Sequence, residues 1–255
     1  VSEFFLKNRH LLGFDNPRKA LLTAIKEAVD NSLDACDEAG ILPEISVAVN
    51  QTGPRRFCVA IQDNGPGILR AQIPKIFAKL LYGSKFHRLR MSRGQQGIGI
   101  SAAGMYGQLT TGKSTVIKSK VKNGKTAHHI EVQIDTRLNK PVILKDAELD
   151  WHPCFFATAA DGTTQLCAEY KQGTCVQIEM EAAYARGKLS VDEYLKQCAI
   201  VNPHLRLHYQ INLSANTEPN GARDAENAAD GATTPRQPAW ITFERGTNEL
   251  PRQPH

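Results

Sequence analysis

The sequence lacks the features of a membrane-spanning, secreted or disulfide-rich protein. It contains no run of about 18 apolar residues, as a transmembrane helix requires, and its opening stretch "VSEFFLKNRH" is too charged for the apolar region of a signal peptide. Its six cysteines form no Cys-x-x-Cys pair and lie in apolar or helical stretches, where thiols pack as small hydrophobic groups. We therefore expect reduced, buried thiols in a cytoplasmic protein with no membrane partner.

A zinc site is the alternative use of these cysteines. His152, Cys154, Cys167 and Cys175 offer the imidazole and thiolate ligands that zinc prefers. Their spacing matches no common zinc-ligand pattern, so buried thiols are the favoured interpretation.

The net charge of +5 is modest and is compatible with a DNA partner, a nucleotide or neither. The densest basic stretch, residues 75–93, is typical of a solvated surface. The 255 residues are enough for one sizeable domain. Because the chain begins with Val1 and residues 250–255 resemble a linker, we expect it to be a piece of a longer protein.

A long helix is predicted for residues 17–39. Asn16 supplies a capping side chain, Pro17 suits the first helical position, and Gly40 is a typical helix stop. Apolar residues recur at helical spacing and predict a buried face. A second, polar stripe combines Glu27, Asn31, Asp34 and Glu38.

The rest of the chain alternates strands with shorter helices. "EISVAVN" and "RFCVAIQD" predict an antiparallel hairpin, and the second strand ends at the sharp turn Asp63-Asn64-Gly65-Pro66-Gly67. Further helices are expected near residues 73–81 and 100–108 and in "SVDEYLKQCAIVNP"; further strands are expected near 114–122 and 127–135, in "GTCVQIEME" and in "AWITFER". Residues 214–238 lack apolar periodicity and predict a flexible insertion.

Residues 107–114 match the P-loop pattern G-x-x-x-x-G-K-S letter for letter. A P-loop follows a strand and opens a helix, so that free helix N–H groups point at phosphate. Here "ISAAGMYGQL" before the loop is helical in character, and "STVIKSKV" after it alternates as a strand does. We therefore interpret the match as a coincidence and expect its glycines to end a helix.

Four other short motifs are a better candidate for nucleotide binding. They are Glu27-x-x-x-Asn31 on the long helix, Asp63-x-Gly65-x-Gly67 at a strand end, Gly94-x-x-Gly97-x-Gly99 before a helix, and Gly173-Thr174 at the start of a strand.

Each motif has residue types that suit one part of a nucleotide. The amide oxygen of Asn31 is a hard ligand for Mg²⁺, and Glu27, one helical turn away, can accept a proton from the water that attacks a γ-phosphate. Asp63 offers an acceptor for the adenine amino group, and the glycines after it let the backbone approach the ring. The glycines before residue 100 expose N–H groups to phosphates.

In this order and spacing, the motifs resemble those of the GHKL ATPases, the superfamily of gyrase, histidine kinases, MutL and a major heat-shock chaperone. Longer stretches, above all "SRGQQGIGIS" and "QLTTGK", resemble the B subunits of DNA topoisomerase VI, a type IIB enzyme, across nearly the whole chain. This resemblance implies an α+β fold: a two-layer sandwich with a mixed, mostly antiparallel sheet and helices on one face.

The same resemblance implies a role for each matching residue. Glu27 would be the general base, Asn31 the Mg²⁺-linked nucleotide ligand, and Asp63 the adenine ligand, with Gly67 and Thr174 near the base. Ser84 and Lys85 would contact the phosphates. The phosphate loop and lid, within residues 82–99 and the following helix start, would include Arg93, Gly94, Gln95, Gln96, Gly97, Ile98, Gly99 and Ile100.

The resemblance also implies a domain plan and a function. Residues 1–16 would be a strap, 17–213 the ATP-binding domain, 214–238 a flexible insertion within it, and 239–255 its final strand and a linker to further domains, one of which supplies a lysine to the γ-phosphate. ATP and Mg²⁺ would dimerise two such domains into a gate that captures double-stranded DNA, and hydrolysis would reset it. A separate A subunit would cleave the DNA.

One other function stays open, and a third is disfavoured. An ATP-gated dimerisation module without efficient turnover fits the same motifs, although a pure binder has no use for Glu27. A histidine kinase needs a phosphoacceptor helix before the ATP-binding domain, and the 16 residues before the first long helix are too few for one.

Overall fold

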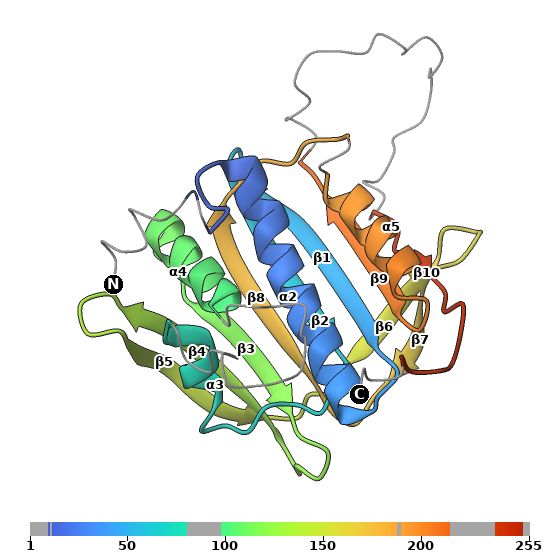
Figure 1. Cartoon of the computed structure of the whole chain (residues 1–255), viewed down its shortest axis with the longest axis horizontal. Helices are drawn as coiled ribbons and strands as arrows, with labels where there is room; N and C mark the ends of the chain where they lie inside the picture. Colours follow the sequence, from blue (N-terminus) through green and yellow to red (C-terminus); the bar gives the residue numbers. More distant parts are fainter. Residues whose placement is uncertain (1–9, 11, 81–97, 188–189, 215–237, 252–255) are drawn as a thin grey trace, which may run out of the picture.

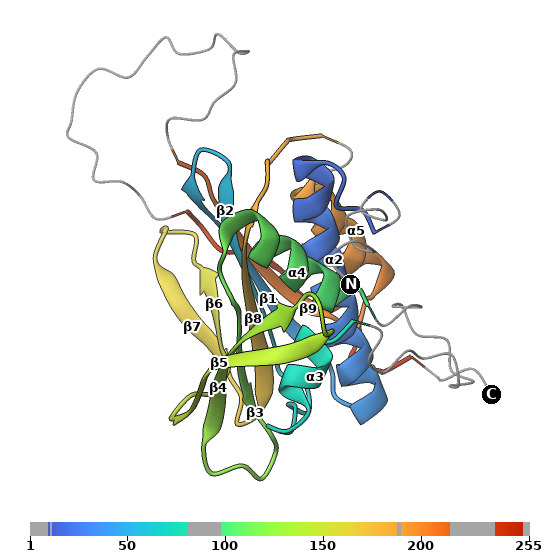
Figure 2. The same cartoon turned by 90° about the vertical axis from the view of Figure 1, so that its left-hand side faces the viewer.

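A computed structural model describes residues 10, 12–80, 98–187, 190–214 and 238–251 of the chain. These residues form an α+β fold in which helices pack on one face of a large sheet (Figures 1 and 2). The helices are α2 (Pro17–Ala39), α3 (Ile73–Ala78), α4 (Gly99–Thr111) and α5 (Val191–Val201). The strands are β1 (Glu44–Gly53), β2 (Arg56–Asp63), β3 (Thr115–Lys120), β4 (Ala127–Asp135), β5 (Lys140–Leu149), β6 (Cys154–Thr158), β7 (Thr164–Glu169), β8 (Gly173–Glu181), β9 (Arg206–Asn212) and β10 (Ile241–Phe243).

The large sheet has eight strands in the order β10-β9-β1-β2-β8-β3-β4-β5. Only β1 and β9 pair in parallel; the other neighbours are antiparallel, so the predicted mixed, mostly antiparallel sheet is confirmed. The predicted hairpin is β1–β2. Pairing of β2 with β8 places Asp63 opposite Thr174, which brings two of the predicted motifs together from distant parts of the sequence.

Helix α2 begins and ends where its sequence predicts. The side chain of Asn16 accepts the N–H of Arg18, Pro17 occupies the first turn, and Gly40 closes the helix with a φ of 67°. Its apolar face is buried in the core, where Leu21, Ile25 and Leu33 are at most 1% exposed. The helix therefore lies fixed across the sheet and presents its polar side residues at defined positions.

Several elements differ from the predictions. Strands β5, β6, β7 and β9 were not predicted. Of these, β6 and β7 form a separate two-stranded sheet on the opposite side of the large sheet from the helices (Figure 2). Helix α3 is shorter than expected and ends at Ala78. Most of the predicted lid, at residues 82–99, and nearly all of the insertion lie outside the described residues.

The predictions drawn from the cysteines and the charge are confirmed only in part. All six thiols are free, but only Cys36 and Cys198 are fully buried; the other four are half-buried.

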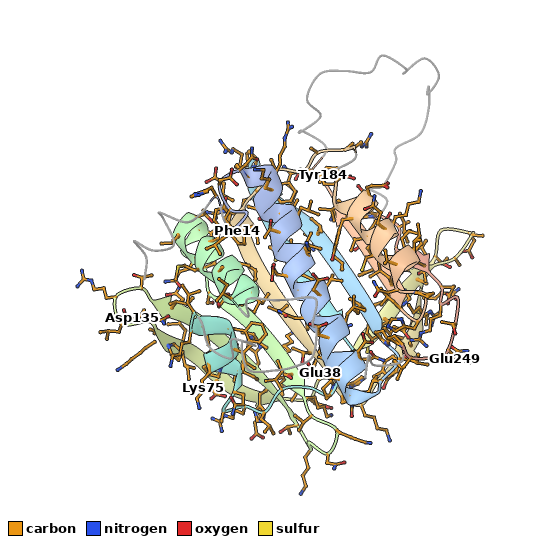
Figure 3. All side chains as sticks on the ribbon, in the orientation of Figure 1. Phe14, Glu38, Lys75, Asp135, Tyr184 and Glu249 are labelled. Atoms are coloured by element: carbon orange, nitrogen blue, oxygen red, sulfur yellow. The ribbon has the colours of Figure 1, made fainter. Side chains whose placement is uncertain are left out.

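Lys75 on α3 is exposed, as expected of the basic stretch (Figure 3), although residues 81–93 of that stretch lie outside the described ranges. Among the helices of the described ranges, none combines the length and apolar character needed to span a bilayer.

Candidate functional site

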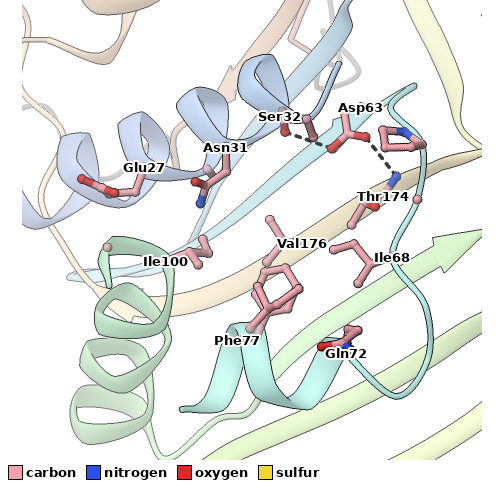
Figure 4. A pocket seen from close by; sticks show the side chains of 16 residues that line it. Glu27, Asn31, Ser32, Asp63, Ile68, Gln72, Phe77, Ile100, Thr174 and Val176 are labelled. Atoms are coloured by element: carbon pink, nitrogen blue, oxygen red, sulfur yellow. Dashed lines mark hydrogen bonds between the residues drawn. The ribbon is translucent and has the colours of Figure 1, made fainter. Parts of the chain in front are cut away.

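A pocket of about 400 Å³ lies between the helices and the sheet. This volume is in the range of small-molecule binding sites. Figure 4 shows it from close by, with α2 along one side and polar groups at both ends of an apolar middle. Its lining residues are Glu27, Ala28, Asn31, Ser32, Ala35, Asp63, Pro66, Gly67, Ile68, Gln72, Ile76, Phe77, Gly99, Ile100, Thr174 and Val176.

Asp63 lies at one end of the pocket and is held by three donors. Its Oδ1 accepts the N–H groups of Gly65 at 2.9 Å and Thr174 at 3.2 Å, and its Oδ2 accepts the hydroxyl of Ser32 at 2.9 Å (Figure 4). A carboxylate has about four acceptor positions, so Oδ2 keeps one for a ligand. The end of β2 therefore presents one oriented acceptor to the pocket.

The burial of Asp63 changes its acidity. The side chain is only 7% exposed, and desolvation raises the pKa of its carboxyl to about 6, although the three hydrogen bonds act in the opposite direction. Asp63 is thus largely ionised at neutral pH and protonated in mildly acidic solution.

Thr174 is fixed from the neighbouring strand. Its hydroxyl lies 3.0 Å from that of Ser119 on β3, and Ser119 Oγ also accepts the N–H of Ile68 at 2.8 Å. This links the loop after β2 to the middle of the sheet. The wall of the pocket beside Asp63 is therefore tied together by hydrogen bonds from three segments.

Glu27 lies at the other end of the pocket, against the first residue of α4. A Cβ added to Gly99 would lie 1.7 Å from Glu27 Oε2, so only glycine leaves room for this carboxylate. Burial, and then the nearby charge of Asp30, raise the pKa of Glu27 above its ordinary value. A carboxylate with a raised pKa is a better proton acceptor, as a general base requires.

The first turn of α4 faces this end of the pocket. The cap residue, Ile98, makes no side-chain hydrogen bond to the first N–H groups of the helix. Unpaired N–H groups and the positive end of the helix dipole together favour an anion. Asn31 lies on α2 between Glu27 and Asp63, with its amide directed to the pocket (Figure 4).

The structure brings together most of the predicted site residues that it describes. Glu27, Asn31, Asp63, Gly67, Gly99, Ile100 and Thr174 all line the pocket, whereas Ile98 is buried outside it. Ser84, Lys85, Arg93, Gly94, Gln95, Gln96 and Gly97 lie outside the described residues.

The structure gives the two glycines after Asp63 structural roles in addition to the predicted close approach of the backbone to a ring. Gly67 has a φ of 74°, and a Cβ there would lie 2.2 Å from the carbonyl oxygen of Lys120, so it allows two backbones to cross. Gly65 donates to Asp63 and does not line the pocket.

Only the first two residues of the polar stripe predicted on α2, Glu27 and Asn31, line the pocket. Asp34 is buried, Glu38 is exposed near the end of the helix (Figure 3), and neither lines the pocket. The pocket instead follows the boundary between the polar and apolar faces, where Ser32 and Ala35 lie. Ser32 was missed by sequence reasoning; the only signal was a hydroxyl on the apolar side of an otherwise regular helix.

The apparent P-loop lies at the opposite end of α4 from the pocket. Gly112 is the C-cap of this helix, with a φ of 74°, and β3 follows at Thr115. The predicted order of helix, turn and strand is confirmed. Lys113 and Ser114 do not line the pocket.

Comparison with known proteins identifies the fold of this site. Residues 16–137 match the family described as histidine kinase-, DNA gyrase B-, and HSP90-like ATPase. These residues, a little under half of the chain, carry the ATPase domain that this family describes. The match covers the pocket residues from α2 to α4, and it agrees with the α+β architecture predicted from the motifs.

Curated relatives refine the comparison. The chain is 47% identical over 253 residues (99% of the chain) to the B subunit of type 2 DNA topoisomerase 6 from Methanosarcina barkeri. It is 52% identical over 252 residues (98% of the chain) to that of Methanococcoides burtonii, and 53% identical over 208 residues (81%) to that of Methanosarcina mazei. The predicted similarity to topoisomerase VI B subunits is thus confirmed. The chain spans about a third of the length of these relatives, at 34%, 34% and 31%.

Proposed function

We propose that this chain is the ATP-binding and ATP-hydrolysing domain of the B subunit of a type IIB DNA topoisomerase. The observation that carries the proposal is the layout of the pocket. It has a single oriented acceptor, Asp63, at one end, and a carboxylate, Glu27, beside an uncapped helix N-terminus at the other. A nucleotide has matching ends, a base with an amino donor and a polyphosphate anion.

ATP fits this layout in one direction. The adenine amino group would donate to Asp63 Oδ2, and the ring would lie among the apolar side chains of Ile68, Phe77 and Val176. The phosphates would then extend along α2 toward the N–H groups that open α4. The family resemblance adds Ser84, Lys85 and residues 93–97 to the phosphate contacts.

Mg²⁺ fits the phosphate end. Asn31 offers a neutral oxygen ligand on the pocket wall, and Mg²⁺ binds proteins through one or two such ligands while it keeps waters and phosphate oxygens. When bound, the ion would neutralise phosphate charge. Asn31 would hold it one helical turn from Glu27.

Glu27 would act as the general base. Water attacks the γ-phosphorus, the bond to the β-phosphate oxygen breaks, and Glu27 takes the proton of the water. The raised pKa of Glu27 suits this role. The alternative, an ATP-gated dimerisation module without efficient turnover, leaves this carboxylate without a purpose.

The names of the relatives support a proposal for the activity of the whole protein. Two ATP-bound copies would dimerise into a gate for double-stranded DNA, and hydrolysis would reopen it. An A subunit would cleave the DNA, in the cytoplasm. The parts of the relatives that this chain does not span would link the gate to that subunit.

Thermal unfolding with Mg²⁺ and a non-hydrolysable ATP analogue tests the site. At a hundred times its dissociation constant, the ligand should add about 2.7 kcal/mol to the free energy of unfolding. We expect Asp63→Ala to abolish this gain and Lys113→Ala, on the exposed turn of the apparent P-loop, to keep it. If Lys113→Ala abolished the gain and Asp63→Ala kept it, the nucleotide would bind at the other end of α4 and the proposal would be wrong.

A further inference from the structure

A cluster of three metal-ligating side chains lies at the open end of the β6–β7 hairpin. His152 Nε2 is 3.0 Å from Glu169 Oε1, and the ligand atoms of His152, Cys154 and Glu169 all lie within 4.8 Å of one another. Cys154 and Glu169 are direct cross-strand partners, and His152 lies two residues before Cys154. Backbone pairing thus holds one ligand on each strand at a fixed separation, with the third beside them.

The chemistry of this donor set is specific. Thiolate and imidazole are ligands for zinc and similar transition metals rather than for Mg²⁺ or Ca²⁺. Three protein ligands leave a fourth tetrahedral position for water. Among the described residues, the carboxylate of Glu169 pairs with His152 and with no lysine or arginine.

A second cluster of possible metal ligands differs from the first because its carboxylate is already paired with arginine side chains. Glu44, Cys167 and His208 also bring three ligand atoms together. Glu44, however, already pairs with Arg206 at 3.4 Å, Arg245 at 3.3 Å and His208 at 3.1 Å, and it accepts the hydroxyl of Tyr170 at 2.6 Å. Two guanidinium groups beside this carboxylate repel a metal cation, and they already balance its charge.

We propose that His152, Cys154 and Glu169 form a zinc site that pins the hairpin at its open end. This changes the zinc set considered from the sequence: Glu169 replaces Cys167 and Cys175, which lie outside the cluster. Binding forms one zinc–sulfur bond and releases the thiol proton of Cys154 to solvent, while neutral His152 and ionised Glu169 bind without a further proton change.

The site also lies behind the adenine end of the pocket. Cys154 O accepts the amide of Gln62 at 2.7 Å, one residue before Asp63. A Cβ on Gly173 would lie 2.6 Å from Pro153, so the segment between His152 and Cys154 packs on the strand that carries Thr174. Zinc would therefore hold the hairpin against the back of the strands that carry Asp63 and Thr174, from the face opposite the helices (Figure 2).

Cobalt(II) is a suitable probe, because a thiolate bound to it gives a charge-transfer band in the near ultraviolet. The full chain, stripped of metal and kept reduced, should bind one Co²⁺ with this band, and Zn²⁺ should displace it. Cys154→Ser should abolish the band, and His152→Ala and Glu169→Gln should each weaken binding by about tenfold or more. Zn²⁺ should raise the melting temperature of the wild type but not of Cys154→Ser.

Cys167→Ser is the matched control, because it removes a half-buried thiol from the competing cluster. It should keep the band and the Zn²⁺-dependent rise in melting temperature. Absence of a thiolate–cobalt band in the folded wild type, or its loss in Cys167→Ser and survival in Cys154→Ser, would overturn the proposal. This test needs no nucleotide, so it succeeds or fails independently of the proposed ATPase function.

Discussion

The two ends of α4 both carry glycines, but only one end suits a phosphate. Gly99 opens the helix at the pocket, where uncapped N–H groups and the positive end of the dipole face Glu27 and Asn31. Gly112 closes it about 20 Å away, at 1.5 Å for each of the helix's 13 residues, where carbonyl groups disfavour an anion. A phosphate site therefore depends on the direction of the helix and not only on the letters around it.

The glycines of the apparent P-loop have structural reasons of their own. Gly107 lies inside α4, and a Cβ there would lie 2.6 Å from Glu179 O, so it lets the helix approach β8. Gly112 adopts the left-handed conformation of a helix C-cap and donates to Gln108 O. Packing and capping thus account for both glycines without a ligand.

Glu27→Gln should give the largest functional effect at the pocket end. The amide keeps the size of the side chain but cannot accept the proton, so hydrolysis should fall by about a thousandfold while nucleotide binding stays. Single-turnover hydrolysis with the chain in excess over ATP measures the first, and an analogue titration the second. Retained turnover would remove Glu27 from the role of base.

Gly99→Ala should come next. The added methyl meets the carboxylate of Glu27, which is the flexible end of a side chain, so Glu27 should move and the helix should stay. A displacement of about 1 Å in a catalytic group can cost about a hundredfold in rate. We expect that loss in the same hydrolysis assay, with a nearly unchanged melting temperature. An unchanged rate would mean that the position of Glu27 beside α4 does not matter.

The acidity of Asp63 predicts a smaller, pH-dependent effect. Its pKa of about 6 means that the acceptor is lost as the pH falls through 6, so affinity for the ATP analogue should drop about tenfold between pH 7 and pH 5. In the absence of nucleotide, a fall in pH has the opposite effect: it stabilises the folded chain at this residue. The folded chain keeps a proton that the unfolded chain has lost, so this residue makes the free energy of unfolding rise over the same fall in pH.

Asp63→Asn is the control for both trends, since an amide does not titrate. Its nucleotide affinity should be weaker at pH 7 and flat down to pH 5 in calorimetric titrations. The wild type and this variant should also differ in the pH dependence of urea unfolding. Parallel curves would show that another group carries the titration.

Local sequence signals predicted the parts of the site that depend on local structure. The caps of α2, the hairpin that ends at Asp63 and the start of α4 follow from residue types and spacing. These elements bring Glu27, Asn31 and Gly99 to the lining of the pocket. The meeting of Asp63 with Thr174, 111 residues apart, came only from the resemblance, because strand order is not written in either motif.

What sequence reasoning missed depends on contacts between distant segments. Ser32 matters only because Asp63 lies across from it, and the β6–β7 hairpin matters because it packs behind β2 and β8. The polar stripe on α2 continues to Asp34 and Glu38, which do not line the pocket, because periodicity gives a direction around the helix but not the length of the cleft beside it.

Gly112→Ala should have the smallest effect on function and separates the two ends of α4. No atom lies within 4 Å of the position of its added Cβ, so the only cost is the left-handed backbone, about 1 kcal/mol of stability. Urea unfolding should show that loss, and analogue titration should show unchanged affinity. A fall in affinity would place phosphate at the C-terminal end of the helix. If instead Gly99→Ala alters turnover while Gly112→Ala alters only stability, then the helix direction, rather than the glycine pattern, decides where the nucleotide binds.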